Sequence, residues 1–262
     1  MKEFKIASWN VNSIRARLPI ILDWLKINNF DVVLFQEIKT EEQNFPFQDL
    51  ESLGYNVVLS GQKSYNGVAI ISKYIISDVK TKLPTREKDD QARYIEAWIN
   101  LDDRGIRVAS IYAPNGNPIE SEKYDYKLSW MKSFYDYAKL LSEYEENIIL
   151  GGDYNICPNL IDVANEEMIS KDAIYNQEAR KIFKKIKNLN FFDAFRTLNT
   201  RDPGFTYWDY GSAFRNDLGV RIDHFLATPQ IVDKCNKVWV DKDVRNKPKP
   251  SDHAPICMSI KI

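Results

Sequence analysis

Carboxylates close two apolar runs of this sequence, and a third carboxylate stands beside one of only two histidines. Glu37 ends an apolar run at 31–36, Asp153 follows two glycines after a run at 147–150, and Asp252 directly precedes His253. Each motif alone is better explained by a strand that ends in a turn, since Asp and Asn commonly start turns. The three motifs together favour a metal-assisted hydrolase, in which acids and a scarce histidine share one site.

Hydrolysis of a phosphodiester would give these acids separate tasks. The reaction needs a bound metal, an activated water and groups that stabilise the charge developing on phosphate oxygens. Magnesium prefers oxygen ligands and keeps several waters, so one or two carboxylates are enough to hold it. Glu37 is the strongest metal-ligand candidate, because its buried strand gives an acid no other role there. Asn10, which follows a strand-like run at 4–9, and Asp252 are further candidates.

The glycines before Asp153 would let the backbone approach a ligand closely. Asp153 could then accept a proton from water, and Asn155 could donate to the phosphate. His253 needs a carboxylate partner to stay oriented or protonated. Asp223 and His224 are adjacent in a strand-like run and point to opposite faces. We expect Asp223 to face the site and pair with His253, and His224 to be structural.

Other motifs are weaker signals. Tyr112 and Asn115 lie where another strand-like run ends, so an ordinary turn explains them as well as a functional role does. The aromatic cluster at 207–210 has core packing as its default interpretation, and lining a pocket for an extruded sugar as the alternative. Arg15, Arg17 and the lysines at 242–249 could contact phosphates.

Composition limits the classes of function. The formal net charge of −1 creates no global positive field, although an enzyme that acts on nucleic acid needs only one basic face. Three widely spaced cysteines argue against a disulfide framework and a zinc-thiolate site. Neither an N-terminal apolar signal segment nor a run near the ~18 apolar residues that span a membrane is present. We therefore expect a soluble cytosolic protein that has no membrane partner.

The pattern of elements predicts one α/β domain covering residues 1–262, with two packed sheets of largely antiparallel or mixed strands beneath helices. Strand-like runs lie at 4–9, 32–36, 56–59, 68–72, 95–101, 106–112, 148–150, 221–227, 238–240 and 256–262. Three amphipathic helices are predicted: one carries Leu18 to Leu25, one covers roughly 121–142, and one carries Ala179 to Ile186. Two such sheets would bring the acid-bearing strand ends to a common pole.

These motifs resemble, in order and nearly end to end, the exonuclease III-type apurinic/apyrimidinic endonucleases of the endonuclease/exonuclease/phosphatase superfamily. The pieces that carry the resemblance are Ser8-Trp9-Asn10-Val11-Asn12-Ser13-Ile14-Arg15-Ala16, Leu34-Phe35-Gln36-Glu37-Ile38-Lys39, Tyr112-Ala113-Pro114-Asn115-Gly116, Gly151-Gly152-Asp153-Tyr154-Asn155, Gly219-Val220-Arg221-Ile222-Asp223-His224 and Ser251-Asp252-His253-Ala254-Pro255.

The resemblance implies a four-layered α/β sandwich, two packed mixed β-sheets flanked by helices, with the site at one sheet edge. It implies Mg²⁺, or Mn²⁺ as a substitute, held chiefly by Glu37 with three other oxygen donors nearby. Asp153 would activate water or protonate the leaving group, and His253 would pair with Asp223. The remaining implied ligands, phosphate contacts and abasic-pocket walls are Asn10, Asn12, Asp252, Tyr112, Asn155, Asn115, Tyr207, Val220 and Ile222.

Four departures from the family pattern qualify the resemblance. Ser13 stands where relatives commonly have glycine, which we interpret as a harmless turn change. Asn12 replaces an Asp found in some relatives, which makes a second metal position less favourable. Val220 is smaller than the residue often found there, which would loosen the pocket. Asn117-Pro118 follows the Tyr112 motif without an arginine that could insert into the duplex.

The function that we expect is cleavage of double-stranded DNA 5′ to abasic sites by a monomeric enzyme. Exonuclease activity from 3′ to 5′ and repair of blocked 3′ ends are expected companions. One alternative is a phosphatase or phosphodiesterase of the same superfamily that acts on lipid or inositol phosphates. Another is a catalytically silent DNA-binding protein, against which the acids Glu37, Asp153 and Asp223 argue, since they would surround an anionic ligand.

Overall fold

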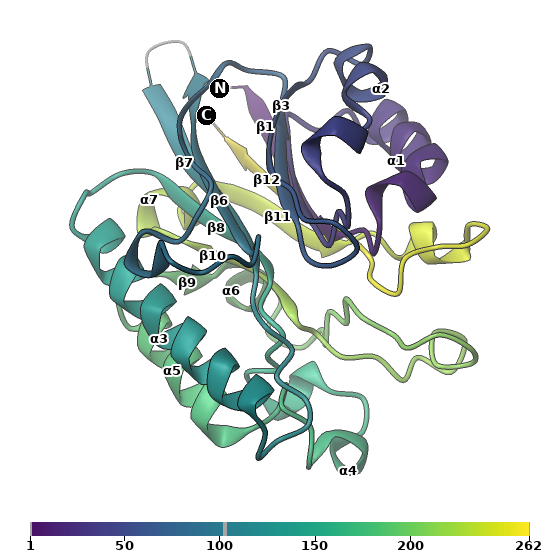
Figure 1. The fold of residues 1–262 in the computed structure, drawn as a ribbon, viewed down its shortest axis with the longest axis vertical. Coiled ribbons are helices and arrows are strands. Elements are labelled where there is room, and N and C mark those ends of the chain that lie inside the picture. Colours follow the sequence, from purple (N-terminus) through teal and green to yellow (C-terminus); the bar gives the residue numbers. More distant parts are fainter. Residues whose placement is uncertain (1, 102–103, 262) are drawn as a thin grey trace.

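Two six-stranded mixed sheets form the centre of the protein, seen in a computed structural model that describes residues 2–101 and 104–261 (Figure 1). The first sheet has the order β11-β12-β1-β2-β4-β3, and the second β5-β6-β7-β8-β10-β9. The strands are β1 Glu3–Asn10, β2 Val32–Gln36, β3 Asn56–Ser60, β4 Val68–Ser72, β5 Ile76–Lys80, β6 Tyr94–Leu101, β7 Arg104–Tyr112, β8 Ile148–Asp153, β9 Phe192–Asp193, β10 Asp223–Ala227, β11 Cys235–Val240 and β12 Ile256–Lys261.

Helices cover the outer face of each sheet, which makes four layers and confirms the expected α/β sandwich (Figure 1). The helices are α1 Ile14–Asn28, α2 Phe47–Glu51, α3 Glu122–Ser142, α4 Glu166–Ile169, α5 Gln177–Lys187, α6 Ala194–Leu198 and α7 Pro229–Val232. In the described part of the chain, no helix is long and apolar enough to cross a membrane.

Strand alternation separates the core into layers. In β12, Ile256, Met258 and Ile260 pack between the two sheets, whereas Cys257 packs on the side of α1. Adjacent residues of a strand point to opposite faces, so one strand serves two hydrophobic clusters. A third cluster joins the second sheet to α3 and α5 through side chains such as Phe134.

One parallel pair lies inside each sheet, and this arrangement positions the site. Strands β1 and β2 run parallel, as do β7 and β8, while the other pairs are antiparallel. The carboxyl ends of parallel neighbours meet at the same sheet edge. The packed sheets therefore bring four strand ends to one pole, as the sequence predicted.

All three predicted helices and all ten predicted strands are present, with differences at their ends. The run expected at 221–227 becomes a strand only from Asp223, because Arg221 turns into a buried ionic cluster with Asp162 and Asp193. Strand β5 was not predicted, since its residues are largely polar and exposed and form no apolar run, and β9 and the short helices were not predicted, since so few residues give no readable periodicity. Residue 262 of the last predicted strand lies outside the described residues.

Candidate active site

The polar residues predicted from the motifs gather where the ends of five strands meet. Asn10 ends β1, Glu37 follows β2, Tyr112 ends β7 and Asp153 ends β8. Asp223 begins β10 and stands opposite Asp153 in the antiparallel register. Each sheet therefore contributes part of one site, although the contributing residues are spread along the sequence from Asn10 to Asp223.

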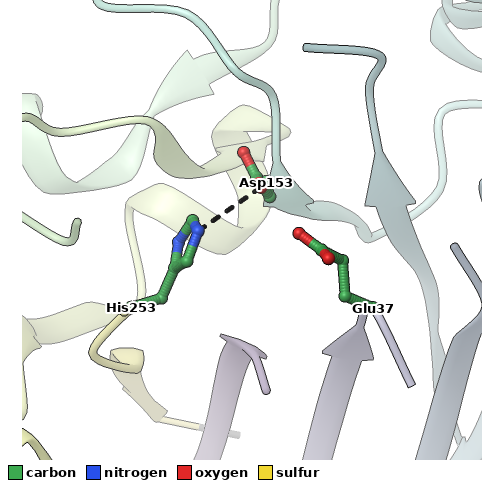
Figure 2. Close-up of side chains that lie close together, drawn as sticks. All are labelled: Glu37, Asp153 and His253. Atoms are coloured by element: carbon green, nitrogen blue, oxygen red, sulfur yellow. Dashed lines mark ion pairs between the residues drawn. The ribbon is translucent and has the colours of Figure 1, made fainter. Parts of the chain in front are cut away.

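Glu37, Asp153 and His253 point toward one another from three separate elements, as Figure 2 shows. One potential ligand atom from each lies within 4.8 Å of those of the other two. The buried amide of Asn10 joins the two acids, because its Nδ2 donates to Glu37 Oε1 at 2.8 Å and to Asp153 Oδ2 at 3.0 Å. Both hydrogens of this amide are used to hold two carboxylates at a fixed separation.

His253 is paired with Asp223, as the sequence analysis expected. Its Nδ1 lies 2.9 Å from Asp223 Oδ2, and its Nε2 faces Asp153 Oδ2 at 3.8 Å. Burial lowers the pKa of His253, but the charge and hydrogen bond of Asp223 outweigh this and raise it to about 10. The imidazole is thus a cation at neutral pH, held between two carboxylates, with Nε2–H free to donate to an anion.

His224 has the structural role that was predicted for it. Its ring nitrogens lie 3.0 Å from a guanidinium nitrogen of Arg221 and 2.9 Å from the Ile156 carbonyl. Burial and the charge of Arg221 lower its pKa to about 4. This histidine is therefore neutral at physiological pH, and it points away from the site.

The two acids of Figure 2 differ in their protonation. Burial, reinforced by the negative charges of Asp223 and Glu37, raises the pKa of Asp153 to about 7. Burial would also raise the pKa of Glu37, but the ammonium of Lys39 at 2.7 Å and the Asn10 amide bring it below its ordinary value. Asp153 can therefore exchange a proton near neutral pH, whereas Glu37 remains a carboxylate.

The donors at this edge fit a hard divalent cation. Glu37 Oε2 and Asn12 Oδ1 already converge on one positive group, the ammonium of Lys39, at 2.7 and 2.6 Å. Carboxylate and amide oxygens are the ligands that Mg²⁺ and Mn²⁺ prefer. A doubly protonated imidazole has no lone pair for a metal, so His253 is excluded as a ligand while it keeps its proton.

Asn12 connects the remaining metal candidate to the site. Its Nδ2 donates to Asp252 Oδ1 at 3.1 Å and to the Tyr210 hydroxyl at 3.0 Å. Asn12 and Glu37 both adopt positive φ, at 44° and 50°, a region that side chains other than glycine enter at a cost. Arg15 is exposed on the first turn of α1, beside this edge.

Ser13, which the sequence analysis treated as a harmless replacement for glycine, also has a positive φ of 92°. This is the region that favours glycine, so the replacement carries backbone strain. Its Oγ accepts a hydrogen bond from the Ala16 amide at 3.4 Å and caps α1.

The predicted phosphate contacts lie on the other side of Asp153. Asn155 is buried, its Nδ2 donates to the Ala113 carbonyl at 3.0 Å, and its Oδ1 accepts from Asn115 at 3.2 Å. One hydrogen of the Asn155 amide is left for a ligand. Burial and the charge of Glu37 raise the pKa of the Tyr112 phenol well above its ordinary range, so this hydroxyl remains a donor.

The predicted sugar pocket is an apolar cluster beside His253. The ring of Tyr207 contacts the His253 ring edge to face, with 5.0 Å between centroids. Tyr207 also pairs with Val220 through a β-bridge, and Ile222 belongs to the same cluster. Trp208, its neighbour in the aromatic motif, is fully buried in the core under α1, as the default interpretation held.

Three residues near the site were missed by the sequence analysis. Lys39 was quoted within a motif but given no role, and Tyr210 was placed only in an aromatic cluster, yet both contact Asn12. Lys127 is fully buried beneath the loops that carry Asn115 and Asn155. The burial of Lys127 could have been predicted, because Lys127 lies three positions from Tyr124 and from Trp130, on the apolar face of its helix.

Comparisons with known proteins agree with this geometry. Residues 7–253 match the model of a family described as "Endonuclease/Exonuclease/phosphatase family". The chain is 32% identical to exodeoxyribonuclease III of Haemophilus influenzae over 98% of this chain and 100% of that protein.

Among solved structures, an AP endonuclease from Archaeoglobus fulgidus has a TM-score of 0.94 and 38% identity, covering 99% of this chain and 100% of that one. The 3′ phosphatase NExo from Neisseria, bound to a product DNA hairpin, has a TM-score of 0.95 and 33% identity over the same shares.

Proposed function

Because the chain belongs to the endonuclease/exonuclease/phosphatase family, we propose that it is a DNA repair hydrolase that cleaves the phosphodiester bond 5′ to abasic sites in double-stranded DNA. We further propose that it removes nucleotides and blocking groups from 3′ ends, as the names of the Haemophilus and Neisseria proteins suggest.

One observation carries the proposal: a buried carboxylate with a pKa near neutrality faces a histidine–aspartate pair and a candidate metal-ligand acid. Asp153 provides the first, Asp223 and His253 the second, and Glu37 the third. An acid and a base with pKa values moved apart by their surroundings are typical of sites of proton transfer. A protein that only binds DNA gains nothing from three acids around an anionic ligand.

The phosphate is held by donors that the fold fixes in advance. The Asn155 amide, the Tyr112 hydroxyl and the Nε2–H of His253 belong to residues that lie next to Asp153, and they carry no negative charge. Hydrogen-bond donors that are already oriented stabilise the charge that builds on phosphate oxygens without reorganising. Their positive or neutral character also offsets the repulsion between the substrate and the nearby acids.

Asp153 moves the proton. Its Oδ2 accepts from Asn10 and its Oδ1 from the backbone amide of Asn155, so the carboxyl group cannot rotate freely. With a pKa of about 7, it can accept a proton from the attacking water or return one to the leaving oxygen. A metal ion held by Glu37, with Asn10, Asn12 and Asp252 nearby, would supply positive charge that polarises the phosphate; we propose Mg²⁺, with Mn²⁺ as a substitute.

The apolar cluster around Tyr207, Val220 and Ile222 would receive the sugar that lacks a base. An apolar wall offers no hydrogen bonds to a base, so selection there would depend on shape and size. The small side chain of Val220 leaves more space beside Tyr207 than a larger residue would.

Cleavage of an end-labelled duplex that carries one tetrahydrofuran abasic analogue tests the proposal. We expect a nick immediately 5′ of the analogue with Mg²⁺, and none with excess chelator. Shortening from the 3′ end alone would change the assignment to an exonuclease. Absence of cleavage on every DNA would direct attention to lipid or inositol phosphates as substrates and to silent DNA binding.

Four accompanying expectations keep the status of predictions: a monomer, a cytosolic location, a single domain over residues 1–262, and no membrane partner. Size-exclusion chromatography with light scattering tests the first, and cell fractionation tests the second. Limited proteolysis tests the third, because one domain should resist cleavage except at exposed loops. Flotation with vesicles tests the last.

A further inference from the structure

Lys127 is a fully buried lysine outside the set of residues that contact the substrate in the proposed mechanism. It lies in the first half of α3, whose other buried side chains include Trp130 and Phe134. Among the described residues, no carboxylate lies within ion-pair distance of its ammonium group. Burying a charge without a counter-ion is costly unless hydrogen bonds replace the lost water.

Three backbone carbonyls replace that water. Lys127 Nζ donates to the carbonyl oxygens of Asn155 at 2.7 Å, Asn115 at 2.9 Å and Ala173 at 3.1 Å. An ammonium group has three N–H donors and no acceptor, so these contacts use its whole capacity.

The three carbonyls belong to three separate loops. Asn115 follows β7, Asn155 follows β8, and Ala173 precedes α5. A second contact ties two of these loops, since the side chain of Asn117 donates to Asp172 and accepts from the Ala173 amide. Lys127 therefore connects the three loops that contain Asn115, Asn155 and Ala173 through one buried ammonium group.

The surrounding chain is adapted to the lysine. Gly116 has φ 86°, and a Cβ atom at this position would lie 2.6 Å from Lys127 Cδ and 3.1 Å from its Cβ. Asn155 has φ 50°, and in this conformation its carbonyl accepts from the ammonium while its side-chain amide donates to the Ala113 carbonyl. A methionine would fill the same space but would leave three carbonyl groups without their donor, so it is the ammonium, and not the side-chain volume, that holds the loops.

We propose that Lys127 is a positioning residue for the reaction: by binding the Asn115, Asn155 and Ala173 carbonyls, it fixes the amides that hold the scissile phosphate. This inference rests on the proposed function. Lys127 acts through Asn155, whose Oδ1 is also held by Asn115 at 3.2 Å. Without the ammonium, three carbonyls would be left in an apolar interior, and the loops would move to reach water.

A double-mutant cycle tests this role on the abasic duplex, with Lys127→Met, Asn155→Ala and the combination. Lys127→Met keeps the length of the side chain and removes all three donors. A displacement of about 1 Å at a reacting group costs about 100-fold, so we expect kcat to fall about 100-fold while KM changes less than about 3-fold. In the Asn155→Ala background the same change should lower kcat less than about 10-fold, because the amide that it positions is gone.

Equal losses in both backgrounds would overturn the proposal, as would an unchanged kcat for Lys127→Met. Two variants on α3 serve as controls for charge loss and for general destabilisation. Lys132→Met removes an exposed lysine, and Leu141→Ala removes a buried side chain at the far end of the helix. Both should keep kcat within about 2-fold of the wild type, since neither contacts the three loops.

If Lys127→Met does not fold, Lys127→Gln takes its place in the cycle, because an amide can keep at most two of the three bonds. The wild-type enzyme separates the two proposals. A wild-type protein that cleaves no DNA refutes the proposed function. A wild-type protein that cleaves, together with additive losses in the cycle, refutes only the role of Lys127.

Discussion

Two buried ionic clusters lie next to each other in this protein, and they treat their acids in opposite ways. In the cluster around Arg221, Asp162 and Asp193 each meet a guanidinium nitrogen, at 2.8 and 2.9 Å. In the site cluster, Asp153 and Asp223 share one imidazolium, and Asp223 Oδ1 has no hydrogen-bond partner among the residues that the structure describes. The first cluster contains enough positive charge for its acids and the second does not.

The pKa values express this difference. Burial opposes ionisation of Asp193, yet the charge of Arg221 holds its pKa far below the ordinary range. Burial and neighbouring acids raise the pKa of Asp153 to about 7. A buried carboxylate that has a cationic partner stabilises the fold. A buried carboxylate without a full cationic partner can instead bind a proton or a metal ion, or act on a substrate.

The largest effect on activity that tests this comparison is expected for a substitution of Asp153. We expect Asp153→Asn to lower kcat by at least about 10³-fold, because an amide cannot accept the proton, while DNA binding changes little. Single-turnover cleavage and a gel-shift titration with chelator measure the two quantities. Unchanged cleavage would remove Asp153 from the mechanism.

The matched substitution in the cluster around Arg221 should lower the stability of the fold and largely preserve the activity. Asp162→Asn leaves Arg221 and Arg196 without one shared carboxylate, so we expect a loss of about 3 kcal/mol in the free energy of unfolding. The folded variant should still cleave within about 10-fold of the wild-type kcat. Urea unfolding and cleavage at 15 °C separate the effects, and a fully stable but inactive variant would contradict the comparison.

A substitution of Glu37 should act mainly on the metal concentration that the reaction requires. We expect Glu37→Ala to raise the Mg²⁺ concentration for half-maximal activity at least about 10-fold, because a carboxylate ligand is lost. Its partner Lys39 stays in place, so folding should change little. A titration of cleavage against Mg²⁺ measures this; coincident curves would exclude Glu37 as a ligand.

The smallest effect is a difference in pH dependence between the two histidines, measured without metal. The folded pKa of His253 is raised to about 10, so its stabilisation is complete below about 6.5 and is lost as pH rises through about 10. The folded pKa of His224 is lowered to about 4, so its stabilisation is present above about 6.5 and is lost as pH falls through about 4.

Urea unfolding with chelator, from pH 4.5 to 9.5, compares the wild type with His253→Asn and His224→Asn. The stability difference for His253→Asn should shrink toward high pH, and that for His224→Asn should shrink toward low pH. If both differences follow the same pH trend, the opposite assignment of charge to the two histidines is wrong.

Most of the architecture was predictable because it depends on local patterns. Alternation in β12 and the 3.6-residue period of α3 are properties of short stretches, and each identified its element within one or two residues. Pairing Asp223 with His253 was also predictable, since a strand shows only one of two adjacent side chains to a site. The same reasoning correctly made His224 structural.

The order of residues establishes which side chains stand at strand ends, whereas the contacts of each side chain depend on how distant segments pack together. Lys39, Tyr210 and Lys127 could not be assigned roles from local patterns, because their partners come from distant loops. The pKa of Asp153 likewise depends on burial and on charges that the packing of two sheets brings together. Hydrophobic periodicity is a property of short stretches of sequence, whereas the charges that surround a side chain are set only when the chain has folded.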